Sequence, residues 1–266
     1  MSAVQVLERQ AYRTPLAVLC QDGVTQATVV DGLVVTAWRR SDPSQRFTAR
    51  RSPISGIYSF GSLPRQWANT HVRVAPGQPV IWPPASPEAW CLLVEDTLGR
   101  YLPTAIAANV PISAPVRVPL SSAPTRLAGD ATAVVRGEIH HDGTSDPLGW
   151  ALIRIDTGAA VYQTVADGSG RFRIQAPYPE ALPVLTGSPP SGPGLSSVMW
   201  PLTITALSQP SVLVRSPGLQ PTDPPELTSI TGQAAAQLIE GAPHAALTET
   251  LQFGTDLVLL LSAVPA

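Results

Sequence analysis

Apolar and polar residues alternate with a period of two through much of the chain, a pattern typical of β-strands that bury one face. In residues 133–139 the positions of one parity are Ala133, Val135, Gly137 and Ile139. The alternation predicts strands of antiparallel sheets in the second half of the chain. These strands cover residues 133–139, 151–155, 161–165 and 171–175.

The first half carries similar apolar runs separated by turn sequences. Asp31-Gly32 lies between two valine-rich runs, and this dipeptide suits a type I′ hairpin turn, which needs positive φ at both central residues. The strands predicted here cover residues 27–30, 33–39, 46–49, 57–60, 71–74 and 90–95. We therefore expect an all-β protein of two small antiparallel β-sandwich domains.

Prolines indicate the domain boundaries, because they favour extended backbone and remove hydrogen-bond donors from a sheet. They recur in residues 107–130 and again in 216–229. The expected division is an N-terminal sandwich over residues 1–106, a Pro-rich linker over 107–130, a second sandwich over 131–215, and an extended connector with a C-terminal assembly segment over 216–266.

The C-terminal segment contains the most apolar stretch of the chain. We expect a short helix over residues 232–240 and a hairpin formed by 248–253 and 257–264. The second hairpin strand is too apolar to stay unpaired in water, so it completes a sheet of its own chain or joins a neighbouring subunit. The residues expected to make assembly contacts are Leu257, Val258, Leu259, Leu260 and Leu261. Removal of residues 248–266 is expected to abolish assembly and to leave 131–215 folded.

Composition and charge narrow the class of protein further. Charged residues make up 14% of the chain, against a usual value of about 25%, and the chain holds 29 Pro and 20 Gly, which favours short strands and tight turns. The net charge is −2, every basic residue is an arginine, and no more than two are consecutive. No nucleic-acid partner is expected, because such binding needs a basic patch.

The hydropathy pattern contains neither a secretory signal nor an apolar run of the roughly 20 residues that cross a bilayer. We expect a cytoplasmic protein, or part of a particle assembled in the cytosol, with no direct membrane insertion. Cys20 and Cys91 each lie in an apolar run, where a thiol behaves as a small buried hydrophobe. Whether they form a disulfide is left open.

The two halves of the chain also resemble each other. Residues 55–60 (SGIYSF) align with residues 169–174 (SGRFRI), and each segment follows a threonine-containing strand. An internal duplication would explain this similarity.

Three separate elements of the second half have the order and spacing of a known family. Residues 135–137 read V-R-G, residues 147–153 read P-L-G-W-A-L-I, and residues 164–172 read T-V-A-D-G-S-G-R-F. In residues 131–180 the chain resembles a carboxypeptidase regulatory-like domain, the transthyretin-like β-sandwich. The resemblance implies a seven-stranded sandwich that accompanies another activity, and it brings no catalytic residues.

The expected architecture also resembles that of accessory proteins of phage-tail-like contractile injection systems. In those particles similar domains decorate or adapt the cap or the baseplate. This resemblance rests on the arrangement of domains and on no motif.

Candidate catalytic and metal sites are few. His140, His141, Asp142 and Asp146 offer metal-ligand chemistry, but neighbouring strand residues point to opposite faces, which favours an exposed loop. The loop Asp167–Gly170 lacks the repeated acidic residues of a calcium loop. No metal or other cofactor is expected.

A nucleophilic enzyme is the third-ranked hypothesis. It would need His71 beside Cys20 or Cys91, and neither cysteine lies in a motif that lowers a thiol pKa. Phosphate binding is not indicated either, because no glycine-rich phosphate loop follows a strand.

Tryptophans raise an alternative function, since aromatic faces stack on sugar rings. Trp67, Trp82 and Trp90 lie in the first domain and would form the platform of a carbohydrate- or protein-binding module. Our main hypothesis is a non-enzymatic assembly subunit, a cap or baseplate adaptor of such a particle, with other protein subunits as partners and itself homo-oligomeric within the assembly.

Overall fold

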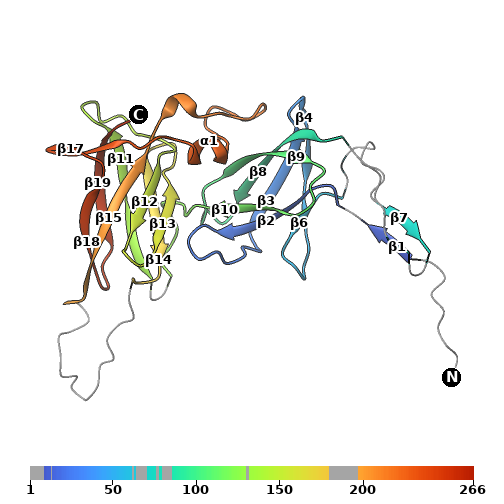
Figure 1. The fold of residues 1–266 in the computed structure, drawn as a ribbon, viewed down its shortest axis with the longest axis horizontal. Coiled ribbons are helices and arrows are strands. Elements are labelled where there is room, and N and C mark those ends of the chain that lie inside the picture. Colours follow the sequence, from blue (N-terminus) through green and yellow to red (C-terminus); the bar gives the residue numbers. More distant parts are fainter. Residues whose placement is uncertain are drawn as a thin grey trace, which may run out of the picture.

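The computed structural model describes residues 9–12, 14–61, 63, 71–75, 78–79, 86–129, 132–179 and 197–266. Within these ranges the chain is nearly all β-structure, arranged as two β-sandwiches side by side with one short α-helix, α1 (Leu227–Thr231), between them (Figure 1). A 3-10 helix, η3, covers Pro210–Val212. A separate two-stranded sheet pairs β1 (Arg9–Tyr12) with β7 (His71–Val74). The all-β fold class is confirmed.

The first sandwich contains two four-stranded sheets. One has the order β10-β2-β6-β5 and the other β4-β3-β8-β9. The strands of the first sheet are β2 (Ala17–Asp22), β5 (Arg50–Arg51), β6 (Tyr58–Ser59) and β10 (Val116–Leu120). Those of the second are β3 (Leu33–Arg39), β4 (Asp42–Thr48), β8 (Glu88–Asp96) and β9 (Thr104–Val110).

The second sandwich pairs a five-stranded sheet, β14-β11-β19-β16-β17, with a four-stranded sheet, β13-β12-β15-β18. The strands of the first are β11 (Ala133–His141), β14 (Arg171–Ala176), β16 (Gln237–Glu240), β17 (Ala242–His244) and β19 (Leu257–Val264). Those of the second are β12 (Leu152–Asp156), β13 (Val161–Val165), β15 (Met199–Leu207) and β18 (Leu247–Gln252).

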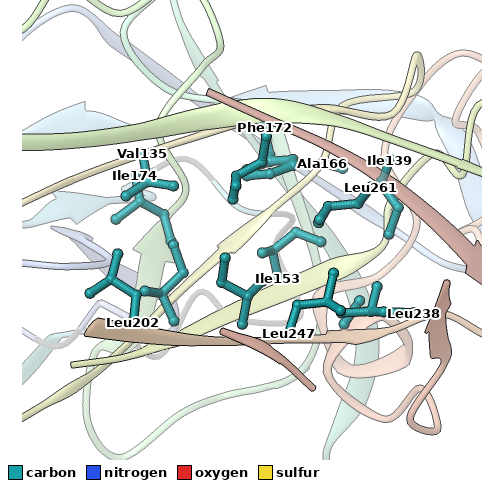
Figure 2. Packing of buried hydrophobic residues seen from close by; sticks show 14 of the residues in the cluster. Val135, Ile139, Ile153, Ala166, Phe172, Ile174, Leu202, Leu238, Leu247 and Leu261 are labelled. Atoms are coloured by element: carbon teal, nitrogen blue, oxygen red, sulfur yellow. The ribbon is translucent and has the colours of Figure 1, made fainter. Parts of the chain in front are cut away.

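Alternating side chains of the two facing sheets fill each sandwich. In the second, Val135, Ile139 and Phe172 of one sheet meet Ile153 and Leu202 of the other (Figure 2). In the first, Val18 and Val118 lie in one cluster with Trp90 and Leu92. Burial of these alternating apolar positions is the main stabilising contribution to each sandwich.

Seven strands have the same arrangement in both sandwiches, and β5 in the first and β16-β17 in the second are added to it. The order β10-β2-β6 of the first recurs as β19-β11-β14 in the second, with one parallel pair (β10 with β2, β19 with β11) and one antiparallel pair. The antiparallel order β4-β3-β8-β9 recurs as β13-β12-β15-β18. The segments 55–60 and 169–174, aligned from sequence, lead into the equivalent strands β6 and β14.

Details of the backbone support this correspondence. Gly23 N donates to Leu120 O, and Asp142 N donates to Ala263 O, just past the equivalent parallel pairs. In the turn that follows, Gln26 and Ser145 have φ of 59° and 60°, a conformation that few non-glycine residues adopt. The two halves therefore share turns as well as strands.

Residues 107–130 do not form a free linker, which corrects that prediction. They supply the end of β9 and all of β10, both of them paired within the first sandwich. Pro119 fits in a strand because β10 lies at the edge of its sheet. Of residues 107–130, those that follow β10 lead from the first sandwich to the second. Arg126 holds this stretch against the first sandwich, because it pairs with Asp22 at 2.7 Å.

Residues 216–226, here called the strap, also differ from the expected free connector. They fold back over the outer face of the β4-β3-β8-β9 sheet, where Leu219 packs on buried Trp38 and Cys91. Glu226 is buried, accepts a hydrogen bond from Ser216 Oγ at 2.8 Å and pairs with Arg40 at 3.2 Å. The strap thus ties the second half of the chain to the first.

Two local predictions near the C-terminus are wrong. Residues 232–240 form no helix: they contain β16, whose Leu238 enters the core of the second sandwich. Residues 248–253 and 257–264 form no hairpin either, because β18 pairs with β15 and β19 pairs with β11 and β16 in the opposite sheet.

Candidate functional site

The strand β19, expected to join a neighbouring subunit, lies inside a sheet of its own chain. It pairs in parallel with β11 from Leu257 to Ala263 and antiparallel with β16 from Ser262 to Val264. The strand therefore completes a sheet of its own chain, which is the first of the two outcomes expected from the sequence.

Side chains of β19 divide between two faces. Leu259 and Leu261 point into the core and are 5% and 3% exposed. Val258 and Leu260 point outward and are 61% and 78% exposed. Leu257 is half-buried against the core. Of the five predicted assembly residues, the structure therefore leaves two, Val258 and Leu260, with their side chains mostly in solvent.

Charged residues from β11 and β14 share this outer face. The register places Arg136 opposite both Arg173 and Val258, and it places Glu138 opposite both Arg171 and Leu260. Two rows therefore cross the sheet, one reading Arg173, Arg136, Val258 and the other Arg171, Glu138, Leu260. We call these six residues the β19 face.

A groove of about 460 Å³ lies over the β19 face and is lined by five of its six residues, with Arg173 next to Arg136 just outside the lining. Its floor includes Arg136, Glu138 and Leu260, and its wall is formed by Pro124 and Thr125 of the stretch between the sandwiches. The wall is fixed, because Gln175 Nε2 donates to the carbonyl oxygen of Leu127 at 2.7 Å.

Electrostatics of the face are dominated by arginine. Arg136 pairs with Asp256 at 3.0 Å, and Arg171 pairs with Asp167 at 3.1 Å. Arg173 forms no ion pair with any residue that the structure describes, and its Nε is buried without a hydrogen-bond partner. Burial lowers the pKa of Arg173, the Asp256 carboxylate acts in the opposite direction, and the neighbouring Arg136 and Arg126 lower it further.

The first sandwich provides an internal comparison for this face. There Ala17 pairs with Ser59 where the second sandwich has Arg136 and Arg173. The position equivalent to Leu260 is Arg117, which is exposed and pairs with Leu19 just as Leu260 pairs with Glu138. The shared topology thus requires neither the exposed leucine nor the facing arginines.

The tryptophan platform is not supported by Trp90. This residue is fully buried between the sheets of the first sandwich, where it contacts Phe47 at a ring-centroid distance of 5.9 Å. A buried ring cannot stack on a sugar, because both of its faces are covered. Trp67 and Trp82 lie outside the described residues.

Both cysteines are free and buried, as expected for structural thiols. Burial raises the pKa of Cys20 to about 12 and raises that of Cys91 as well. A thiol with a raised pKa is a poor nucleophile at neutral pH. The side chain of His71 is not among those described, so the His71–cysteine cluster that the enzyme hypothesis would need is untested.

The His140–Asp146 region forms local contacts. His140 Nε2 lies 3.3 Å from Glu138 Oε2, and His141 Nδ1 donates to the carbonyl oxygen of Asp142 at 2.8 Å. In the described part of the chain, no cluster of three metal-ligating side chains occurs. The loop carboxylate of Asp167 accepts hydrogen bonds from the Ser169 and Arg171 amides, as in a tight turn.

No helix in the described part of the chain has the length and apolarity to cross a bilayer.

Comparisons with known proteins are sparse. No family model matches the chain, and no curated protein is similar to it. The carboxypeptidase regulatory-like domain expected for residues 131–180 therefore has no support from these comparisons.

Among solved structures the chain aligns with the Bacillus anthracis TIE protein and with pilin subunits. It aligns with the Bacillus anthracis TIE protein at 10% identity and a TM-score of 0.26, over 94% of this chain and 34% of that one. It aligns with BcpA, the major pilin subunit of Bacillus cereus, at 10% identity and 0.28, over 97% and 57%. The shaft pilin spaA of Lactobacillus rhamnosus GG gives 9% and 0.24, over 95% and 98%. TM-scores this low establish no shared fold, and the chain spans only part of the first two proteins.

Sequence reasoning identified β19 but missed the arginines beside it. The alternation had already placed Arg171 and Arg173 on the outer face of their strand. The missing information was the pairing of β14 with β11, which brings Arg173 opposite Arg136.

Proposed function

We propose that the chain is a non-enzymatic β-sandwich subunit that binds another protein through the β19 face. The observation that carries the proposal is the exposure of Leu260 at a position where the first sandwich has Arg117. An exposed leucine beside an exposed valine costs free energy in water, and an arginine would avoid that cost.

Two edge strands of the second sandwich favour its face, and not these edges, as the binding surface. The edge strand β17 carries Pro243, which lacks an amide donor, and the edge strand β18 carries Glu249. Prolines and charges at sheet edges oppose pairing with another chain. Face-to-face docking does not require a free edge.

Rigidity suits a binding subunit of this kind. The strap and the stretch 121–127 each contact the opposite sandwich, and a further apolar cluster joins the two halves. The members of that cluster are Leu102, Ala123, Trp150, Leu152, Val165 and Ile230. A rigid pair of sandwiches holds the β19 face in a fixed orientation, which reduces the entropic cost of association.

The test compares two substitutions in the tagged full chain, Leu260→Arg and Val161→Arg. Val161 is 62% exposed on β13 of the opposite sheet and serves as the matched control. Proteins retained from the native source are quantified for each variant. We expect a species retained by the wild type and by Val161→Arg and lost with Leu260→Arg. Equal retention by all three chains would contradict the proposal.

The narrower form of the proposal is an adaptor at the cap or baseplate of a contractile injection particle, assembled in the cytosol. It rests on the arrangement of domains in the sequence. Electron microscopy of particles purified from the native source, with an antibody against this chain, tests it: labelled particles support the adaptor, and unlabelled particles refute it.

A further inference from the structure

The outer face of β11 and β14 contains a pair of like charges. Arg136 and Arg173 are register partners on neighbouring strands, so their side chains leave the sheet on the same side. Like charges placed directly opposite each other on neighbouring strands destabilise a sheet. The fold of the second sandwich therefore includes a local arrangement that works against its own stability.

The first sandwich shows that the topology does not need this pair. At the equivalent positions Ala17 and Ser59 are register partners, and both are small and uncharged. A pair of residues that destabilises the fold, and that the equivalent positions of the first sandwich lack, is typical of a functional site.

Neighbouring carboxylates do not fully neutralise the arginines. Asp256 holds Arg136 in a pair whose side chains are 49% and 41% exposed, and exposed pairs of this kind are weak and exchangeable. Arg173 has no carboxylate within ion-pair distance among the described residues. An incoming carboxylate would therefore meet one unpaired guanidinium and one that is weakly paired.

Aliphatic side chains lie directly beside these arginines. Val258 is the register partner of Arg136, and Leu260 follows two residues later on the same face. We propose, building on the function proposed above, that the groove over the β19 face takes a protein segment in which a carboxylate side chain lies next to branched aliphatic side chains. Guanidinium groups bind carboxylates through paired hydrogen bonds, and the aliphatic groups of the segment cover Val258 and Leu260.

The experiment uses the full chain and two acetylated, dye-labelled octapeptides, one of alternating Leu and Glu and one of alternating Leu and Gln. Fluorescence anisotropy at low salt is expected to show that the Glu peptide binds about tenfold more tightly, because a charge-assisted hydrogen bond contributes roughly 1.5–3 kcal/mol. The preference is expected to fall as salt rises. Equal binding of both peptides, or binding of neither, overturns the inference.

The matched variant is the double substitution Arg136→Ala with Arg173→Ser, which installs the residues of the first sandwich. It is expected to fold, to keep the circular dichroism of the wild type, and to lose the preference for the Glu peptide. An unchanged preference in this variant overturns the inference.

Comparison with Leu260→Arg separates this inference from the function on which it rests. If Leu260→Arg removes the retained native protein and the double variant keeps it, the face binds a partner but not through carboxylates. If both variants retain it, the face is not a binding surface. Self-association of the wild type that Leu260→Arg abolishes would assign the groove to a second copy of the chain and overturn the inference.

Discussion

Trp38 donates its indole Nε1–H to the carbonyl oxygen of Pro217 at 2.7 Å, although the two residues are 179 positions apart. Arg46 lies over the ring of Trp38 at 4.4 Å and donates to the carbonyl oxygen of Gly218. Trp38 is itself fully buried beneath the strap. This contact joins a strand of the first sandwich to a segment that belongs to the second half of the chain.

Trp38→Phe keeps an aromatic ring but removes the donor to Pro217. We expect the free energy of unfolding to fall by about 1 kcal/mol or more, because the carbonyl oxygen loses its partner and the smaller ring leaves a void. Hydrogen exchange should also accelerate at the Leu219 and Glu226 amides of the strap. Urea unfolding and exchange measured by mass spectrometry check both effects, and unchanged exchange in the strap would show that the contact does not hold it.

Asp22 predicts a dependence of stability on pH. Burial raises the pKa of Asp22, but hydrogen bonds from the Thr25 amide, from Arg126 and from the Val24 amide outweigh it, so the net pKa is lowered. A lowered pKa in the folded state contributes stability above the unfolded carboxyl pKa of about 3.9, and this contribution is lost as the pH falls through the lower folded value.

The corresponding variant is Asp22→Asn. At pH 7 we expect it to lower the free energy of unfolding by about 2 kcal/mol, since Arg126 loses a nearly buried partner. The difference from wild type should shrink as the pH falls below about 4. Asp156→Asn, at the exposed end of β12, is the control and should show little effect. A difference for Asp22→Asn that stays constant from pH 7 to pH 3 would refute this assignment.

Gly137 allows the close parallel pairing of β11 with β19. A Cβ at this position would overlap the carbonyl oxygen of its register partner Leu259. We expect Gly137→Ala to lower the free energy of unfolding by about 2 kcal/mol, because the two strands must separate. Gly61→Ala is the matched control, since a Cβ there has no atom within 4 Å. Thermal unfolding measures the midpoint of each variant. Equal midpoints would argue against the close approach of β11 and β19.

The period-two alternation was enough to predict the fold class and most strands, because the buried face of each strand is determined by the strand's own residues. It could not reveal which strands pair. Thr248 and Leu257 begin segments that look like a hairpin, but the turn between them carries the chain from one sheet to the other. The prolines led to wrong predictions of free linkers for a similar reason. Pro119 lies in an edge strand, and Pro217 lies in the strap. The site residue Arg173 became recognisable only through its partner on β11.

Truncation after Leu247 separates the present structure from the sequence-based expectation. Residues 248–266 include Leu251, Leu259 and Leu261, which are buried in the second core. Loss of each buried leucine costs about 2–5 kcal/mol, and the sum over the three is comparable to the whole stability of an ordinary domain. We expect the second sandwich to unfold, with limited proteolysis cutting throughout residues 132–179. A protected fragment over that range would instead support the earlier expectation.

The most direct measurement of the central claim, that the β19 face binds a protein, is site-specific photo-crosslinking in the native source. A photoreactive residue replaces Leu260 in one full-length chain and Val161 in another. The account predicts a discrete adduct with another polypeptide from position 260 and none from position 161. No adduct from position 260, or the same adduct from both positions, would contradict it.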